Sequence, residues 1–205
     1  MTVDYFHDIP VLTFVVSYSI APNGMILFAI CISSLVALLL SLISAFTCIF
    51  VKRTELTSNF QQTYDLGLWS WGMFTDPAQS YSSDCYRYGS DDPVDGILDF
   101  ARLNGVLAII FGGLVLVITW VSVCIPFSET MMVMLGIGYF LTSACEGSKL
   151  FILDAGVCKT SINDYEWEDC ELGSGAEICI ATVCLWFLGG VISLIAAYLM
   201  RNSYQ

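Results

Sequence analysis

Residues 103–125 read LNGVLAIIFGGLVLVITWVSVCI, a stretch without a single charged side chain. A helix needs about 20 mostly apolar residues to cross the hydrocarbon core of a bilayer. Because no water is present there, the backbone must satisfy its own hydrogen bonds, and a helix does so. The stretch therefore predicts a membrane-spanning helix.

Three other stretches have a similar length and composition, namely residues 24–51, 131–153 and 176–200. Only a short turn separates residues 103–125 from residues 131–153, so these two helices must form an antiparallel hairpin. A mean hydropathy of +0.74 and 57% hydrophobic residues agree with a membrane protein. We predict a mainly α membrane protein, an antiparallel bundle of four transmembrane helices in one domain that spans residues 1–205.

Two polar loops, residues 54–100 and 154–175, join the helices and must emerge on the same side of the membrane. Most of the formal net charge of −12 lies on this side. A surface with this much negative charge repels nucleic acid and attracts cations or a basic partner. We expect no nucleic-acid partner.

The orientation of the loops is predicted differently by two signals. The few Lys and Arg residues lie mainly on the loop side, which by the positive-inside rule favours the cytoplasm. Cys158 and Cys170 are close enough in sequence to form a disulfide, which needs an oxidising compartment. Cys85 is then left over, or exchanges with either partner. We expect both loops to be extracellular or lumenal, in a plasma membrane or a thylakoid.

Small residues recur at a spacing of four in two of the expected spans, where they form grooves for a neighbouring helix. The grooves favour packing within one chain, and the alternative is that one of them faces outward and docks a partner. The residues are Ser33, Ala37, Ser41 and Ala45 in the first span, and Gly189, Ser193 and Ala197 in the last.

Glu146 and Lys149 are charged residues inside an expected span, and their spacing of three places them on one helix face. The Glu146 carboxylate fits an ion pair with Lys149, or with Arg102, which directly precedes residues 103–125. It also fits a ligand for an ion or for the metal of a pigment. An unpaired Arg102 in lipid is costly, so we expect its guanidinium to turn toward loop acids or backbone carbonyls.

Residues that could carry out catalysis are scarce. The chain has one histidine, His7, and contains neither a P-loop nor a G-x-S-x-G or H-E-x-x-H motif. We expect a non-enzymatic protein that requires no cofactor, although a bound lipid or pigment would fit its class.

Four aspartates of the first loop are the best candidates for a metal site. They lack the alternating spacing and the closing glutamate of an EF-hand. They equally fit a solvated face at the start of a helix, where acids are favourable. These aspartates are Asp91, Asp92, Asp95 and Asp99.

Gly67-Leu68-Trp69 lies in the first loop, and Phe100-Ala101-Arg102-Leu103 opens the second span. With the loop order and lengths, these residues resemble the claudin superfamily, which comprises claudins, peripheral-myelin-protein-like tetraspans, channel gamma subunits and fungal cortical tetraspans. The resemblance implies a small antiparallel sheet formed by the two loops, with Gly67-Leu68-Trp69 within or beside it. Gly72 stands where the family has its first loop cysteine, so the resemblance does not imply the usual disulfide at Cys85.

Three functions fit this sequence. The first is an accessory or scaffolding subunit of a larger membrane complex, such as an ion channel or a photosynthetic pigment–protein assembly. Its partners would be membrane lipid and other integral membrane proteins. The alternative is a claudin-like adhesion or barrier protein that forms contacts at the cell surface. The third is a small channel or transporter, which the scarcity of polar residues along the spans disfavours.

Overall fold

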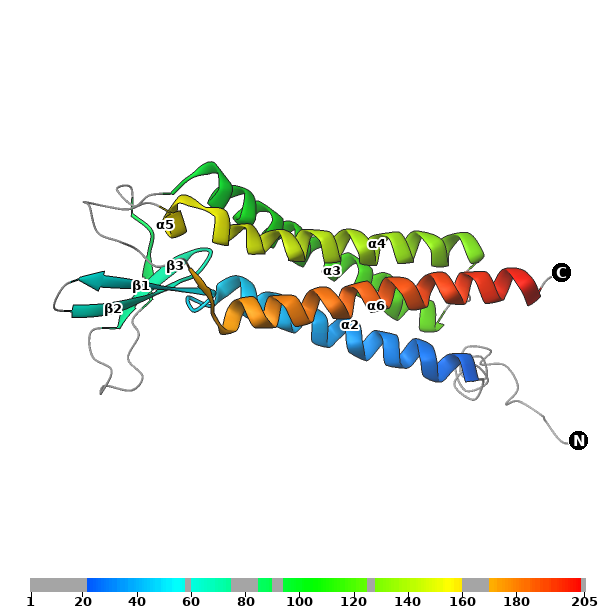
Figure 1. The fold of residues 1–205 in the computed structure, drawn as a ribbon. Helices are drawn as coiled ribbons and strands as arrows, with labels where there is room; N and C mark the ends of the chain where they lie inside the picture. Colours follow the sequence, from blue (N-terminus) through cyan, green and yellow to red (C-terminus); the bar gives the residue numbers. More distant parts are fainter. Residues whose placement is uncertain are drawn as a thin grey trace, which may run out of the picture.

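The computed structural model describes residues 22–57, 60–74, 85–89, 94–124, 128–159 and 170–203. Within these residues four long helices run side by side, and a small sheet lies at one end of them (Figure 1). Neighbouring helices pack in the cyclic order α2, α3, α4 and α6. Their bounds are α2 (Pro22–Phe46), α3 (Gly96–Cys124), α4 (Glu129–Gly147) and α6 (Ser174–Ser203).

Three of these helices are long and apolar enough to cross a membrane, which indicates a membrane protein. Their apolar segments are Phe28–Phe46, Gly96–Ser122 and Ser174–Asn202. The fourth helix, α4, is not among them. It ends at Gly147, and the chain continues as the 3-10 helix η1 (Ser148–Asp154). The predicted span 131–153 is therefore two elements, because the winding changes beside the charged pair Glu146 and Lys149.

The ends of two other helices differ from the predicted bounds. α2 ends at Phe46, not at residue 51, because the chain turns there and enters the sheet at Val51. α3 begins at Gly96, well before residue 103. Asp95 caps its first turn, since the Leu98 amide donates to Asp95 Oδ1 at 2.9 Å.

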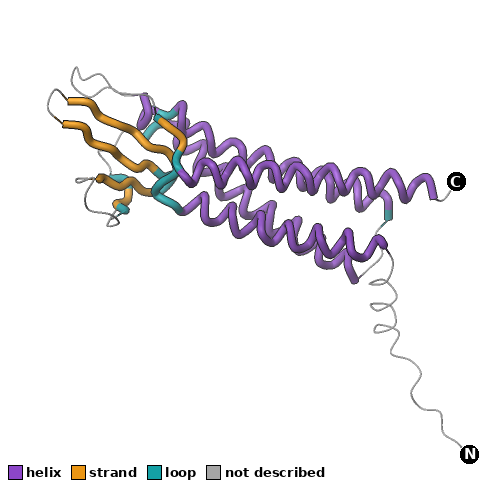
Figure 2. Tube along the Cα trace, turned by 60° about the horizontal axis from the view of Figure 1, so that its bottom comes forward, coloured by secondary structure: helices purple, strands orange, loops and turns teal. Residues whose placement is uncertain are grey.

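The two loops together build one five-stranded sheet, in the order β4-β3-β2-β1-β5, and every neighbouring pair is antiparallel (Figure 2). The first loop supplies four strands and the second loop supplies β5, which pairs with β1 through Val51 and Leu172. This confirms the predicted small antiparallel sheet. The strands are β1 (Val51–Thr57), β2 (Phe60–Leu66), β3 (Ser70–Phe74), β4 (Tyr86–Arg87) and β5 (Glu171–Leu172).

The buried apolar residues form two clusters. One lies between the sheet and the helix ends, where Val51 and Leu68 pack against Leu98 and Ile152. The other lies in the middle of the bundle and includes Tyr139 and Trp186. The first cluster fixes the sheet on the helices, and the second holds the helices together.

Candidate functional site

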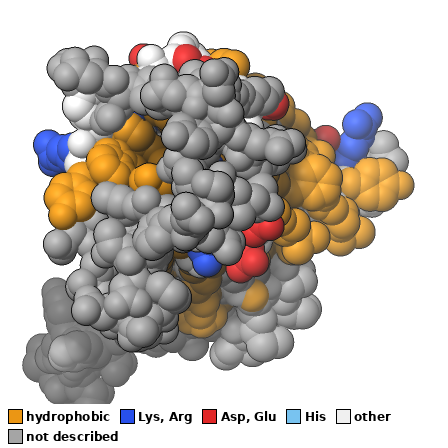
Figure 3. Space-filling model, turned by 60° about the vertical axis from the view of Figure 1, so that its left-hand side comes forward, with side chains coloured by type: hydrophobic (Ala, Val, Ile, Leu, Met, Phe, Trp, Pro, Cys, Tyr) orange, Lys and Arg blue, Asp and Glu red, His pale blue; other side chains and the backbone are white. Residues whose placement is uncertain are grey.

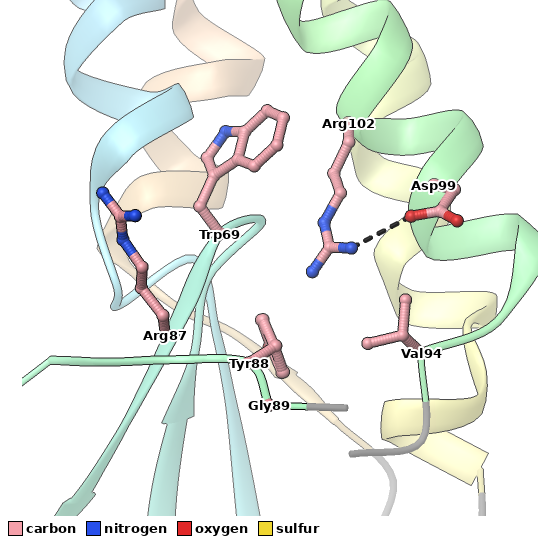
Figure 4. A pocket seen from close by; sticks show the side chains of 7 residues that line it. All are labelled: Trp69, Arg87, Tyr88, Gly89, Val94, Asp99 and Arg102. Carbon is pink, nitrogen blue, oxygen red and sulfur yellow. Dashed lines mark hydrogen bonds and ion pairs between the residues drawn. The ribbon is translucent and has the colours of Figure 1, made fainter. Parts of the chain in front are cut away.

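Arg102 connects the first loop to α3. Its Nε donates to the backbone oxygen of Leu68 at 2.7 Å, and its Nη1 pairs with Asp99 at 2.9 Å (Figure 4). The guanidinium carbon lies 5.6 Å from the ring centre of Trp69 and 5.2 Å from that of Tyr88. A cation at this distance from an aromatic ring is attracted to it. Arg102 thus points toward an acid and a backbone carbonyl, in the way the sequence analysis expected.

The chain reverses between β2 and β3 at Gly67, where the Gly67 amide donates to the oxygen of Ser70 at 2.7 Å. The Tyr88 hydroxyl donates to the oxygen of Gly67 at 2.9 Å. A side chain at position 67 would collide with the carbonyl oxygen of Thr47, which explains why glycine stands there. We call Gly67, Leu68, Trp69, Tyr88 and Arg102 the loop clamp, because their contacts hold the first loop against α3.

A cavity of about 500 Å³ opens beside the loop clamp. Its walls come from the β2–β3 turn, from β4 and the residues after it, and from the start of α3 (Figure 4). Trp69 is exposed in this wall, whereas Trp71 packs on the underside of the sheet. The described residues that line it are Trp69, Arg87, Tyr88, Gly89, Val94, Asp99 and Arg102.

Two disulfides stabilise the loops. Cys158 is bonded to Cys170, as the sequence analysis predicted. Cys85 is neither left over nor an alternative partner for these two, because it is bonded to Cys48. Cys48 was expected inside the first span, but α2 ends at Phe46 and leaves Cys48 between α2 and β1. The odd number of loop cysteines was a signal that one partner was missing.

Glu146 and Lys149 form a fully buried ion pair with an oxygen-to-nitrogen distance of 2.6 Å. The hydroxyls of Ser41 and Ser44 donate to the two carboxylate oxygens at 2.5 and 3.1 Å. The Lys149 ammonium also donates to the backbone oxygen of Ser41 at 3.1 Å. Lys149 and Arg102 were the two expected partners for Glu146. In the structure Glu146 pairs with Lys149, and Arg102 lies in the loop clamp instead.

A second polar cluster lies deeper in the bundle and was missed by the sequence analysis. The Tyr139 hydroxyl lies 2.5 Å from the hydroxyl of Ser34 and 3.0 Å from that of Thr119. All three residues are buried and come from three different helices. Single hydroxyl residues within apolar runs gave no sign of this pairing, because nothing in the sequence fixes how the helices rotate.

The small-residue grooves lie inside the bundle. Ala37, Ser41 and Ala45 are buried in α2, as are Gly189, Ser193 and Ala197 in α6, while Ser33 is half-buried and donates to the oxygen of Ile30. A Cβ atom at Gly189 would lie 2.7 Å from the Tyr139 ring. The grooves therefore serve packing within the chain, and their burial disfavours docking of a partner on them.

The aspartates that the structure describes do not form a metal site. Asp95 accepts from the amides of Leu98 at 2.9 Å and Gly156 at 2.6 Å, and so joins α3 to α5 (Gly156–Lys159). Asp99 pairs with Arg102. Asp91 and Asp92, like His7, lie outside the described residues. Within those residues no three His, Cys, Asp or Glu side chains cluster to hold a metal.

Asp65 is a buried carboxylate on β2 that the sequence analysis overlooked. Both of its oxygens lack a hydrogen-bond partner. Burial raises the pKa of the carboxyl above its ordinary 3.8, and the nearby charge of Lys52 opposes this only in part. Its strand neighbours are Lys52 on β1 and Gly72 on β3. Asp65 therefore has no evident role in holding the sheet together.

The chain matches no protein-family model and no curated protein. The resemblance to the claudin superfamily rests on Gly67-Leu68-Trp69, Arg102 and the order of the loops.

Proposed function

We propose that this chain is a claudin-like membrane protein with four spans that acts by contact, as an accessory or scaffolding subunit of a larger membrane complex. In this proposal α4 and η1 together form the fourth span. Support comes from the orientation of Glu146 and Lys149, which are buried against α2 and do not face outward. Charged residues within membranes are expected to face the bundle interior in this way.

The observation that carries the proposal is that the charged groups between the described helices already satisfy one another. Glu146 and Lys149 are the only charged residues buried there, and Ser41 and Ser44 complete their hydrogen bonds. A conducting path must be lined by accessible polar groups, and a substrate site needs free ones. The interior of the bundle thus favours a structural role over transport.

The outward surface supports the same proposal. The three apolar spans expose large side chains such as Leu39 on α2, Leu114 on α3 and Leu188 on α6. Lipid can cover such a surface, and so can a span of another membrane protein. Both are apolar, so the closeness of side-chain packing, and not the exclusion of water, decides which of the two contacts the helix. The two loop disulfides favour an extracellular or lumenal position for the sheet.

Purification from the native membrane in mild detergent tests the proposal. We expect the protein to co-migrate with other integral membrane proteins. Tryptophan replacements at Leu39, Leu114 and Leu188 form a matched set, because each side chain is more than half exposed and on a different span. The replacement that faces the partner should release it, while the other two leave the complex intact. A lone monomer that conducts ions in liposomes would overturn the proposal and favour a channel.

An adhesion or barrier function is the alternative, and the position of the sheet favours it. The sheet lies beyond the helix ends and is fixed there by the loop clamp (Figure 2). A rigid surface of this kind suits contact with a neighbouring cell. Cells that express the protein should then aggregate with one another, and the Arg102→Leu variant should weaken this by loosening the sheet. If cells aggregate to the same extent with and without the protein, an adhesion function is excluded.

A further inference from the structure

The cavity beside the loop clamp carries positive charge in an otherwise acidic protein. Among the described residues that line it are two arginines, Arg102 and Arg87, and one carboxylate, Asp99, whereas the whole chain has a formal net charge of −12. In the view onto the sheet end, apolar side chains lie next to basic and acidic ones (Figure 3). The local excess of guanidinium groups favours an anionic ligand.

Arg102 keeps donors available for such a ligand. A guanidinium has five N–H groups, and the bonds to Leu68 and Asp99 use Nε and Nη1. Its Nη2 has no hydrogen-bond partner in the described chain, and the guanidinium points into the space above Tyr88 and Val94 (Figure 4). A planar guanidinium suits phosphate well, because two parallel N–H groups can reach two oxygens.

Arg87 adds charge at the rim of the cavity. It lies on β4, its side chain is exposed, and in Figure 4 its guanidinium is on the other side of Trp69 from Arg102. It has no ion-pair partner in the described chain. Arg87 therefore attracts an anion without taking part in the contacts that hold the first loop.

An apolar stripe leads away from this cavity along α3. Leu103, Val106 and Ile110 follow Asp99 at helical spacing, and all three side chains are exposed. The stripe lies within the segment Gly96–Ser122, which is apolar enough to cross a membrane. With α3 across a bilayer, the cavity would lie near the end of this apolar segment, at the depth of lipid headgroups.

We propose that the cavity binds the phosphate group of a membrane phospholipid, whose acyl chain lies along the exposed stripe of α3. Phosphate complements the guanidinium of Arg102, the positive charge of Arg87 at the rim attracts it, and the acyl chain complements Leu103, Val106 and Ile110. A free phosphate ion would use the same charges but would gain nothing from the stripe. The proposal requires α3 to cross the bilayer and is independent of any protein partner.

Native mass spectrometry of the full chain in detergent, titrated with phosphatidylglycerol, tests the proposal. Diacylglycerol with the same acyl chains is the matched probe, because it lacks only the phosphate and its headgroup. We expect phosphatidylglycerol to bind, diacylglycerol to bind much more weakly, and inorganic phosphate to compete poorly. Equal binding of the two lipids would overturn the proposal, and so would displacement of the lipid by inorganic phosphate at equal concentration.

Two variants locate the site. Arg87→Gln should weaken phosphatidylglycerol binding by about fivefold, since one basic residue near a membrane surface contributes about this much. Arg102→Lys should weaken phosphatidylglycerol binding as well. Lysine keeps the charge, but its single ammonium group cannot bond to the Leu68 oxygen and to two phosphate oxygens at once, as a planar guanidinium can. Arg201→Gln in the last turn of α6 is the control, an exposed arginine far from the cavity. Arg87→Gln removes no contact of the loop clamp, so unchanged binding in that variant would refute the proposal even if Arg102→Lys misfolds.

Discussion

At the scale of single residues, Asp65 is the clearest source of pH dependence among the described residues outside the spans. Its carboxyl is buried without a hydrogen-bond partner, and desolvation raises its pKa. Between its ordinary pKa of 3.8 and the raised one, the folded chain binds a proton that the unfolded chain does not. The stability of the sheet should therefore rise as the pH falls through the raised pKa.

Asp65→Asn removes this titration. We expect the variant to be more stable at pH 7, by on the order of 1 kcal/mol, because a buried neutral amide costs less than a buried charge. Thermal unfolding in detergent as a function of pH measures the effect. Glu171→Gln is the control, since it removes an exposed carboxylate of the same sheet and leaves Asp65 in place. A profile that Asp65→Asn does not flatten would mean that another group titrates.

Gly67 is the residue whose replacement should most disturb the loop clamp. The Cβ atom of Gly67→Ala would lie against backbone atoms of Thr47, Cys48 and Ser70, which cannot move as a side chain can. We expect a loss of about 1–3 kcal/mol, typical of overpacking. Gly113→Ala is the matched control, since its Cβ atom meets nothing within 4 Å and alanine favours a helix. Hydrogen exchange at the β2–β3 turn should rise in the first variant alone.

At the scale of elements, the disulfides join segments that the helices alone leave apart. Cys48 to Cys85 connects the end of α2 with the start of β4, and Cys158 to Cys170 connects α5 with the start of β5. The sequence separations are 37 and 12 residues. By chain entropy the two bonds contribute about 4 and about 3 kcal/mol to stability.

Peptide mapping after alkylation without reductant tests this pairing. After denaturation without reductant, the four cysteines should be protected and appear as two linked peptide pairs, whereas Cys184, which forms no disulfide, is alkylated. Cys48→Ser should free Cys85 for alkylation and leave the other bond intact. A peptide that links Cys85 to Cys158 or Cys170 would contradict the structure. It would mean that Cys85 replaces one of the two partners in the second disulfide.

At the scale of the whole molecule, the buried pair Glu146 and Lys149 determines how α4 and η1 pack against α2. A single replacement such as Glu146→Leu leaves a buried ammonium without its partner and should cost about 3–5 kcal/mol. The double replacement Glu146→Leu with Lys149→Met removes both charges and should recover most of this loss. Unfolding of the reconstituted protein measures both variants against the parent. A double variant as unstable as the single one would show that the pair also fixes the helix register.

The sequence by itself determined the apolar helices, the common side of the two loops and the disulfide between Cys158 and Cys170. Each of these depends on residues near one another in the chain, through the length of an apolar run or a short loop. The position of Arg102 could be expected as well, because a guanidinium beside lipid must find a partner. The sheet was expected from the resemblance and the loop order.

Only the tertiary structure decided which residues meet across the bundle. The rotation of each helix about its axis buries both small-residue grooves and brings Tyr139 to Ser34 and Thr119, and no local pattern encodes it. The early end of α2, which frees Cys48 for Cys85, depends on how the sheet packs on the helix ends. The cavity beside Arg102 likewise exists because the β2–β3 turn comes to the start of α3, where Arg102 bonds to Leu68, 34 residues away along the chain. Long-range packing sets these features, since each needs partners that sequence distance does not reveal.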